Sequence, residues 1–122
     1  MYVAVLVIPV PAKNMGAYRE WAVKSAEIFK RYGCLEIVDC WDDYVPVGEQ
    51  TDFYRAVAAK DGEKIVVSWQ IWSDKESFYA SEAKMHEDKV LEVSGEIPFD
   101  PSRLIYGCFL PIHTMGLESV DR

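Results

Sequence analysis

The sequence lacks a basic excess, paired cysteines and any long apolar run. Its 20 acidic residues outnumber its 13 lysines and arginines, and the formal net charge is -7. A domain of this charge repels nucleic-acid backbones and anionic membrane surfaces, so we expect neither as a partner. Half of the 122 residues are apolar, which is enough for a single domain spanning 1–122 with a sizeable core.

The three cysteines, Cys34, Cys40 and Cys108, form no Cys-x-x-Cys pair. This pattern argues against a disulfide framework and against a structural zinc site, so we expect reduced thiols, no metal and no cofactor. The apolar start of the chain has no preceding lysine or arginine and is too short to span a bilayer. Without an export signal, the expected location is cytoplasmic.

Apolar periodicity predicts strands and helices in alternation. Strands are expected at 2–8, 34–41, 53–59, 63–72 and 104–112, a first helix between the N-cap Asn14 and the terminating Gly33, and a second helix from 73 to about 93. Asp61 and Gly62 predict a hairpin between 53–59 and 63–72. Ser73 and Glu76 have the spacing of a capping box.

The order β-α-β-β-α-β, with the segment 53–59 as an extra arm, is that of the ferredoxin-like split βαβ arrangement. We therefore expect an α+β fold with an antiparallel sheet and two helices on one face. The strands 2–8 and 63–72 are apolar on both faces, and no element is left over for the second face. A homodimer in which two sheets pack face to face with C2 symmetry would bury it.

Short motifs along nearly the whole chain resemble those of a known family. They include Ala17-Tyr18-Arg19, Asp39-Cys40-Trp41, Val45-Pro46, Thr51-Asp52-Phe53, Val67-Ser68-Trp69, Pro98-Phe99-Asp100 and Ile105-Tyr106-Gly107. With them the chain resembles the YbaA-like family of uncharacterised bacterial proteins, in the dimeric α/β-barrel (ferredoxin-like) superfamily. The resemblance implies this fold and a homodimer. It implies no reaction, because the superfamily includes monooxygenases, haem-handling enzymes and an isomerase, and activity carried across a fold is analogy.

His86 is the candidate catalytic residue. On the second helix Tyr79, Ala83, His86 and Val90 recur at helical spacing, which predicts that His86 faces the sheet. In that position it is either a core histidine satisfied by a hydrogen bond or a general base that lines a pocket. The second histidine, His113, lies near the end of the chain.

Four further residues are candidates for substrate binding. Trp41, Trp69 and Tyr106 could form the walls of a pocket, or they could pack in the core and at the dimer interface. Asp39 lies inside a predicted strand, beside Trp41, where a rigid element would hold its carboxylate.

The remaining acids near Asp39 have a structural interpretation. Asp42 and Asp43 are expected to be solvated at the end of a strand. Asp52 has the context of a turn or cap and is expected to pair with Arg55 or Arg103.

Two functions are compatible with these patterns. The first is a homodimeric protein similar to cofactor-independent monooxygenases or isomerases that acts on a small aromatic compound, with His86 handling the proton. The alternative is a non-enzymatic homodimeric binding or stress-associated protein whose aromatic residues serve only packing. An open pocket beneath the helices favours the first, and a filled interior favours the second.

Overall fold

A computed structural model describes residues 1–90 and 96–116 of the chain, and the fold is α+β. In chain order the elements are β1 (Tyr2–Pro11), the 3₁₀ turn η1 (Ala12–Asn14), α1 (Met15–Arg31), β2 (Glu36–Trp41), α2 (Phe53–Ala56), β3 (Glu63–Trp72), α3 (Lys75–Glu87) and β4 (Ile105–Phe109). The strands form a four-stranded antiparallel sheet in the order β2-β3-β1-β4. The predicted main strands and both long helices are therefore present.

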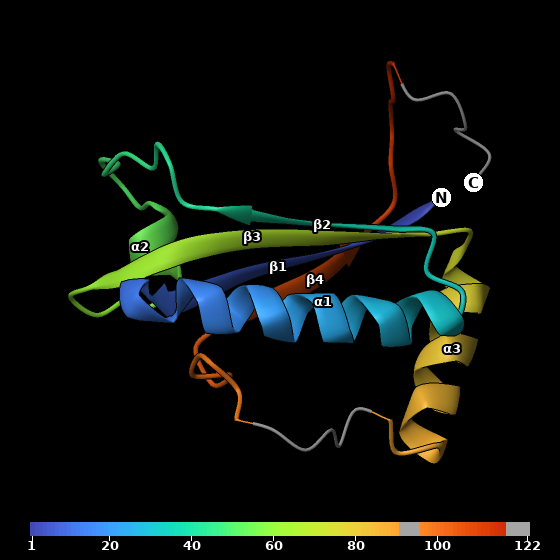
Figure 1. Cartoon of the computed structure of the whole chain (residues 1–122). Helices are drawn as coiled ribbons and strands as arrows, with labels where there is room; N and C mark the ends of the chain where they lie inside the picture. The colour runs from blue at the N-terminus through green and yellow to red at the C-terminus, as the bar shows by residue number, and fades with distance from the viewer. Residues whose placement is uncertain (91–95, 117–122) are drawn as a thin grey trace.

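The strand register divides the sheet into two faces. β1 pairs with β3 from Tyr2 opposite Trp72 to Pro11 opposite Glu63, so alternate residues of both strands share a side. We call the side that carries Tyr2 and Trp72 the helix face, and the side that carries Val3 and Trp69 the open face. Figure 1 shows α1 running along one side of the sheet, and this is the helix face.

The core of the helix face forms under α1. Tyr18 and Ala22 are the buried residues of this helix, and they pack against Ile8 and Phe99. Asn14 precedes the helix as predicted, but its side chain does not cap it. Instead its Nδ2 donates to the carbonyl oxygen of Pro98 at 3.0 Å, which ties the connector 96–104 to the start of α1.

The helix α3 differs from the expectation that both helices cover the helix face. It begins at the end of β3 and points away from the sheet (Figure 1). Its two buried residues, Phe78 and Met85, pack at one end of the helix face, where Trp72 lies. Asp74, rather than the predicted Ser73, caps it by accepting from the backbone N–H of Ser77 at 2.7 Å. The helix ends at Glu87, and the predicted end near 93 lies outside the described residues.

The segment 53–59 is not the predicted hairpin arm but the short helix α2 and its exit turn. The Asp52 carboxylate accepts from the backbone N–H of Arg55 at 2.8 Å, which favours a helical turn over an extended strand. Val57 then packs against Val7 and Ile65 on the open face. The expectation that nothing in the chain covers this face is therefore wrong at the α2 end, while its other end, where Phe109 is 58% exposed, lies open.

Candidate functional site

A cavity of about 360 Å³ lies between α1 and β2 on the helix face. A second space of about 110 Å³ shares five of its lining residues, and we call the two together the α1–β2 cavity; the shared residues are Tyr18, Ala22, Ala26, Ile37 and Asp39. The space exists because Ala22 and Ala26 present only methyl groups where α1 faces β2. Larger side chains there would fill the gap, as they do in most packed cores.

Tyr18 and Asp39 form the polar centre of the α1–β2 cavity. The Tyr18 hydroxyl, from α1, donates to Oδ1 of Asp39, from β2, across 2.8 Å. Burial of Tyr18, followed by the nearby Asp39 carboxylate, raises the pKa of the phenol above its ordinary value. The phenol therefore stays neutral and acts as a hydrogen-bond donor at physiological pH.

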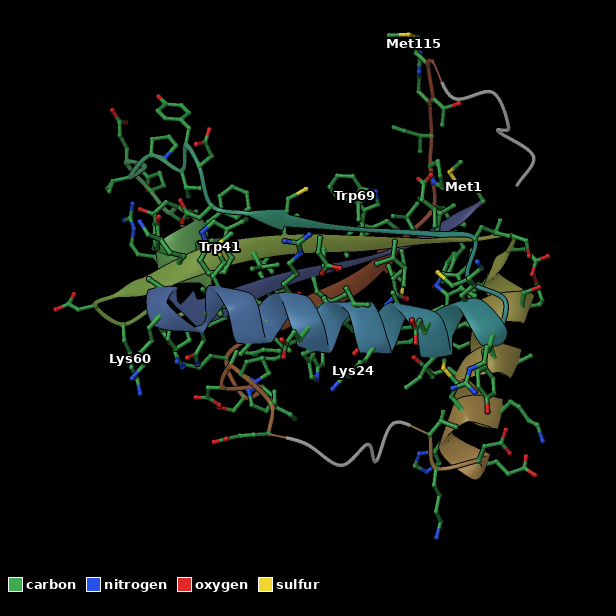
Figure 2. The ribbon with its side chains drawn as sticks, in the orientation of Figure 1. Met1, Lys24, Trp41, Lys60, Trp69 and Met115 are labelled. Atoms are coloured by element: carbon green, nitrogen blue, oxygen red, sulfur yellow. The ribbon has the colours of Figure 1, made fainter. Side chains whose placement is uncertain are left out.

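The walls around this pair are mostly apolar. Ile37, Trp41 and Val66 line the sheet side, and Figure 2 shows Trp41 on the side of the sheet that faces α1. Asp39 is exposed, because β2 is an edge strand and the cavity opens along it. Arg19 carries the other charge in the lining of the 360 Å³ space. The site thus offers a carboxylate, a neutral phenol and a guanidinium around an apolar volume.

The inner part of the α1–β2 cavity contains further polar groups on β3. Ser68 lies opposite Asp39 in the β2–β3 register and is 6% exposed. Gln70 lines the same space, and its Oε1 accepts from Nε1 of Trp72 at 3.0 Å. A ligand that enters beneath α1 would therefore meet polar groups at its inner end as well as at Asp39.

Two of the predicted binding residues line this cavity and two do not. Asp39 and Trp41 lie in its wall. Trp69 pairs with Val38 and Val5 on the open face, and Figure 2 shows it on the side of the sheet away from α1. Tyr106 shares the helix face but lies on β4, at the other edge of the sheet, with its hydroxyl 3.1 Å from Sγ of Cys108.

The prediction that His86 faces the sheet is wrong. α3 buries Phe78 and Met85, and His86 is exposed. The predicted stripe is displaced by one residue, and one residue rotates a side chain by about 100° around a helix. Because α3 also points away from the sheet, His86 does not line the α1–β2 cavity.

The acids after β2 are structural, as predicted, but one of them is not solvated. Asp42 accepts from the Tyr54 hydroxyl at 2.5 Å and from the backbone N–H of Ile65 at 3.0 Å. The expectation for Asp42 was therefore wrong, whereas Asp43 is exposed. The predicted pairing of Asp52 with Arg55 is confirmed, with Nη2 of Arg55 3.0 Å from Oδ2 of Asp52.

The interpretation from sequence missed Tyr18, Arg19 and Ser68 as site residues. Before the structure, Tyr18 and Arg19 were named as part of a family motif, and the Tyr18 hydroxyl received no role. The signal that could have revealed the site is the pair Ala22 and Ala26, which follow Tyr18 on the same helix face and leave room beside it. Ser68 gave no signal, because a serine within an apolar strand is compatible with packing alone.

Residues 1–90 and 96–116 contain no cluster suited to a metal ion. In these ranges no three residues among histidine, cysteine, aspartate and glutamate come together as a possible metal site. All three cysteines are free, and burial raises the pKa of the Cys34 thiol. Along the same ranges no helix combines the length and apolarity needed to cross a membrane.

Comparisons with known proteins agree with the resemblance noted from the motifs. The profile of a family described as "Protein of unknown function (DUF1428)" matches residues 1–101. The protein named "Uncharacterized protein YbaA" from Escherichia coli (strain K12) is 46% identical over 109 residues, which cover 88% of this chain and 93% of the relative. The protein of the same name from Shigella flexneri gives the same identity and coverage.

Proposed function

The chain belongs to the DUF1428 family, and we propose that it forms a homodimer, a dimeric α/β barrel whose subunits have the ferredoxin-like βαββαβ order. In this proposal each subunit binds a small aromatic compound in the α1–β2 cavity and removes a proton from it. Cofactor-independent isomerases and monooxygenases begin with the same step. The observation that carries the proposal is the hydrogen bond between Tyr18 and Asp39 at the opening of a cavity whose walls are mostly apolar.

The cavity suits a ring compound. A dry apolar cavity of roughly 150 Å³ already holds benzene, and the larger space here measures about 360 Å³. Trp41 and Ile37 offer flat and branched apolar surfaces to a ring, while the polar groups are few and grouped around Asp39. A few polar groups within an apolar pocket fix the orientation of a ligand.

Asp39 is the proton acceptor in this proposal. Its Oδ1 is held by Tyr18, and Oδ2 makes no hydrogen bond with the part of the chain that the structure describes. Oδ2 takes a proton from an acidic O–H or C–H of the ligand, and the electron pair of the broken bond stays on the ligand as a phenolate or enolate. Return of the proton to another carbon is isomerisation, and attack of the anion on dissolved dioxygen begins monooxygenation.

Tyr18 supports this step as a neutral donor. Its raised pKa keeps the proton on the phenol, so the hydroxyl holds the carboxylate in place before the transfer. Once Asp39 is protonated it accepts less strongly, and the Tyr18 hydroxyl can donate to the new oxyanion on the ligand.

The open face supports the homodimer. Val3, Val5, Val38 and Trp69 lie on it in neighbouring strands and are only half-buried, and Phe109 is more exposed. A second copy stacked on this face would remove that apolar area from water, and about 800 Å² per partner is typical of a stable interface. The four-stranded antiparallel sheet in the order β2-β3-β1-β4, with α1 and α3 between strands, supports the proposed ferredoxin-like order.

Proton exchange tests the reaction. In D₂O the wild type should catalyse hydrogen–deuterium exchange at the enolisable carbon of 2-tetralone, an aromatic ketone, followed by proton NMR. Asp39→Asn should slow this exchange by about 100-fold or more, the usual scale for a lost general base. Asp43→Asn, a nearby exposed carboxylate, is the matched control and should exchange like the wild type. Equal rates for the Asp39→Asn variant and the wild type would refute the proton-transfer role.

Occupation of the cavity is tested separately. Ala26→Phe places a ring inside the α1–β2 cavity and should abolish ligand binding measured by calorimetry. Ala17→Phe, on the exposed side of the same helix, is the control and should leave binding unchanged. Binding that survives Ala26→Phe would place the ligand elsewhere.

A binding role without turnover is the second candidate. The described lining of the α1–β2 cavity holds one carboxylate and no histidine, which is a sparse set of groups for acid–base chemistry. Binding that is lost in Ala26→Phe, together with no exchange above the buffer rate, would select this candidate.

A further inference from the structure

We propose that the ligand of the α1–β2 cavity is a small aromatic carboxylate that bears a hydroxyl or carbonyl oxygen at the opposite end of its ring. This inference rests on the proposed function and adds the chemical class of the ligand. It is carried by two polar side chains of the cavity, Arg19 and Ser68, whose guanidinium and hydroxyl find no partner among the described residues.

Arg19 defines the outer end of the site. It lines the cavity, yet its guanidinium makes no ion pair or hydrogen bond with residues 1–90 or 96–116. Arg55 is paired with Asp52 and Arg103 with Glu63, whereas Arg19 is exposed at the mouth of the cavity with its guanidinium available to a ligand. A guanidinium presents a planar fork that matches a carboxylate, so the free cation at this position indicates an anionic group on the ligand.

The surroundings of Arg19 indicate that the anion is attached to an apolar body. Met15 and Val23 lie one helical turn to either side of it and also line the cavity. They are 51% and 54% exposed, so their apolar surface is available to a ligand at the mouth of the cavity. A mouth that combines exposed apolar side chains with one cation fits a ring carboxylate better than a fully hydrophilic anion.

Ser68 defines the inner end of the site. It is the buried polar residue of the described chain, at 6% exposure, and its hydroxyl makes no hydrogen bond within the described ranges. A buried hydroxyl without a partner is costly, and native structures seldom keep one without a use. The hydroxyl borders the inner part of the α1–β2 cavity, where an oxygen of the ligand would satisfy it.

Asp39 lies opposite Ser68 and lines the same cavity as Arg19, so it connects the inner and outer ends of the site. Ser68 lies directly opposite Asp39 in the β2–β3 register, and facing residues on one side of a sheet lie about 5 Å apart. The oxygen that binds Ser68 is therefore beside the carboxylate that accepts the proton. Asp39 and Tyr18 line both parts of the cavity, so one ring can extend from Ser68 to Arg19 past the Tyr18–Asp39 pair.

A matrix of three probes and three variants tests the inference by calorimetry. The probes are 4-hydroxybenzoate, which has both groups, benzoate, which lacks the hydroxyl, and 4-hydroxybenzamide, which lacks the charge. The variants are Arg19→Gln, Ser68→Ala and the control Arg31→Gln, which changes an exposed arginine at the far end of α1.

Arg19→Gln should weaken both carboxylates about tenfold and leave the amide unchanged. Ser68→Ala should weaken the two hydroxylated probes about tenfold and leave benzoate unchanged. Arg31→Gln should change nothing. Ser68→Ala should also raise the melting temperature of the ligand-free protein, because it removes an unsatisfied buried hydroxyl; a serine with a structural role would give the opposite shift.

The outcomes separate this inference from the proposed function. Equal affinities for 4-hydroxybenzoate and 4-hydroxybenzamide, with no effect of Arg19→Gln, would overturn the carboxylate assignment while the aromatic site stands. Loss of affinity for all probes in Ser68→Ala alike would overturn the assignment of the inner oxygen. Failure of every probe to bind the wild type at millimolar concentration would overturn the proposed function, and this inference with it.

Discussion

The two faces of the sheet use the same strands for different purposes. On the helix face, α1 lies over the sheet, and two alanines are too small to fill the space between α1 and β2, which leaves a cavity around Tyr18 and Asp39. On the open face, the described charges are few, α2 closes one end through Val57, and apolar side chains such as Phe109 lie exposed at the other. The helix face therefore combines an apolar core with a few polar groups around one cavity, whereas the uncovered end of the open face is apolar and exposed.

This contrast is the basis of the two proposed binding surfaces. An exposed apolar face would be stabilised by a large apolar partner, and in the proposed homodimer a second copy of the chain would supply it. A partly polar cavity beneath a helix is too small for a protein segment and suits a small molecule. Each face also has a segment held by carboxylate hydrogen bonds: the connector 96–104 on the helix face and α2 on the open face.

The largest expected effect distinguishes two tryptophans of β3 that lie on opposite faces. Trp72 is fully buried on the helix face, with its ring 5.4 Å from that of Phe78, so Trp72→Ala should lower the free energy of unfolding by about 3–5 kcal/mol. Trp69→Ala, on the half-buried open face, should lower the free energy of unfolding by clearly less. Urea unfolding at several protein concentrations separates folding from association. If the two variants lose the same free energy of unfolding at all protein concentrations, the proposed difference between the faces is wrong.

The second prediction concerns a substitution that changes the open face alone. Phe109→Asp places a carboxylate where we expect the partner sheet, and it should weaken dimerisation by about 100-fold or more, seen by sedimentation at micromolar concentration. Ligand binding on the helix face should persist. Tyr44→Asp is the control, because Tyr44 is exposed in the loop after β2 and lies on neither sheet face. A wild type that sediments at the mass of one chain would rule out the homodimer.

The third prediction concerns acid and the connector that closes the helix face. Two bonds of 2.6 Å from Arg103 lower the pKa of the Glu63 carboxyl, and bonds from Ser102, then Arg103, lower that of Asp100 to about 2. Both carboxyls bind protons more weakly in the folded than in the unfolded chain, where their pKa values are about 4. Their contribution to stability is therefore complete above pH 4 and is lost as the pH falls toward 2.

Melting curves between pH 2 and 6 check this dependence. Arg103→Gln should lower the melting temperature at neutral pH and flatten its decline in acid, because the folded-state pKa values move back toward their ordinary range. Arg31→Gln, at the exposed end of α1, should leave the acid profile unchanged. Parallel profiles for Arg103→Gln and the wild type would show that these bonds do not govern the acid response.

The smallest expected effect concerns α2, the cover of the open face. Asp52→Ala removes the bonds to the backbone N–H groups of Arg55 and Gly48 and should lower the melting temperature by about 3 °C, the scale of a lost helix cap. Asp43→Ala should cause no measurable change, because Asp43 is exposed and makes no bond among the described residues. Equal shifts in the two variants would mean that α2 is held by packing of Val57 alone.

Much of the fold could be predicted because its signals are local. The alternation in β1 and β3 and the stripe of α1 are patterns of near neighbours, and the structure confirms all three elements. The segment 53–59 was misassigned because its residues favour a strand, whereas the hydrogen bond from the backbone N–H of Arg55 to the Asp52 carboxylate stabilises a helical turn. For the site, the prediction named Asp39 and Trp41 from one strand, and the structure places both in the wall of the cavity, while their role in binding stays a prediction.

The sequence by itself determined the family, the α+β class and the two-sided apolar strands, since each depends on residue order and spacing. Only the tertiary structure decided which side chains share a site. The rotation of α3 turned His86 to solvent, and the approach of α1 to β2 brought Tyr18 to Asp39 across a gap left by two alanines. The physical reason is that a cavity is made by residues far apart in the chain whose volumes fail to fill the space between them. A local pattern such as Ala22 and Ala26 shows small side chains on one helix, but it does not show which residues lie opposite them.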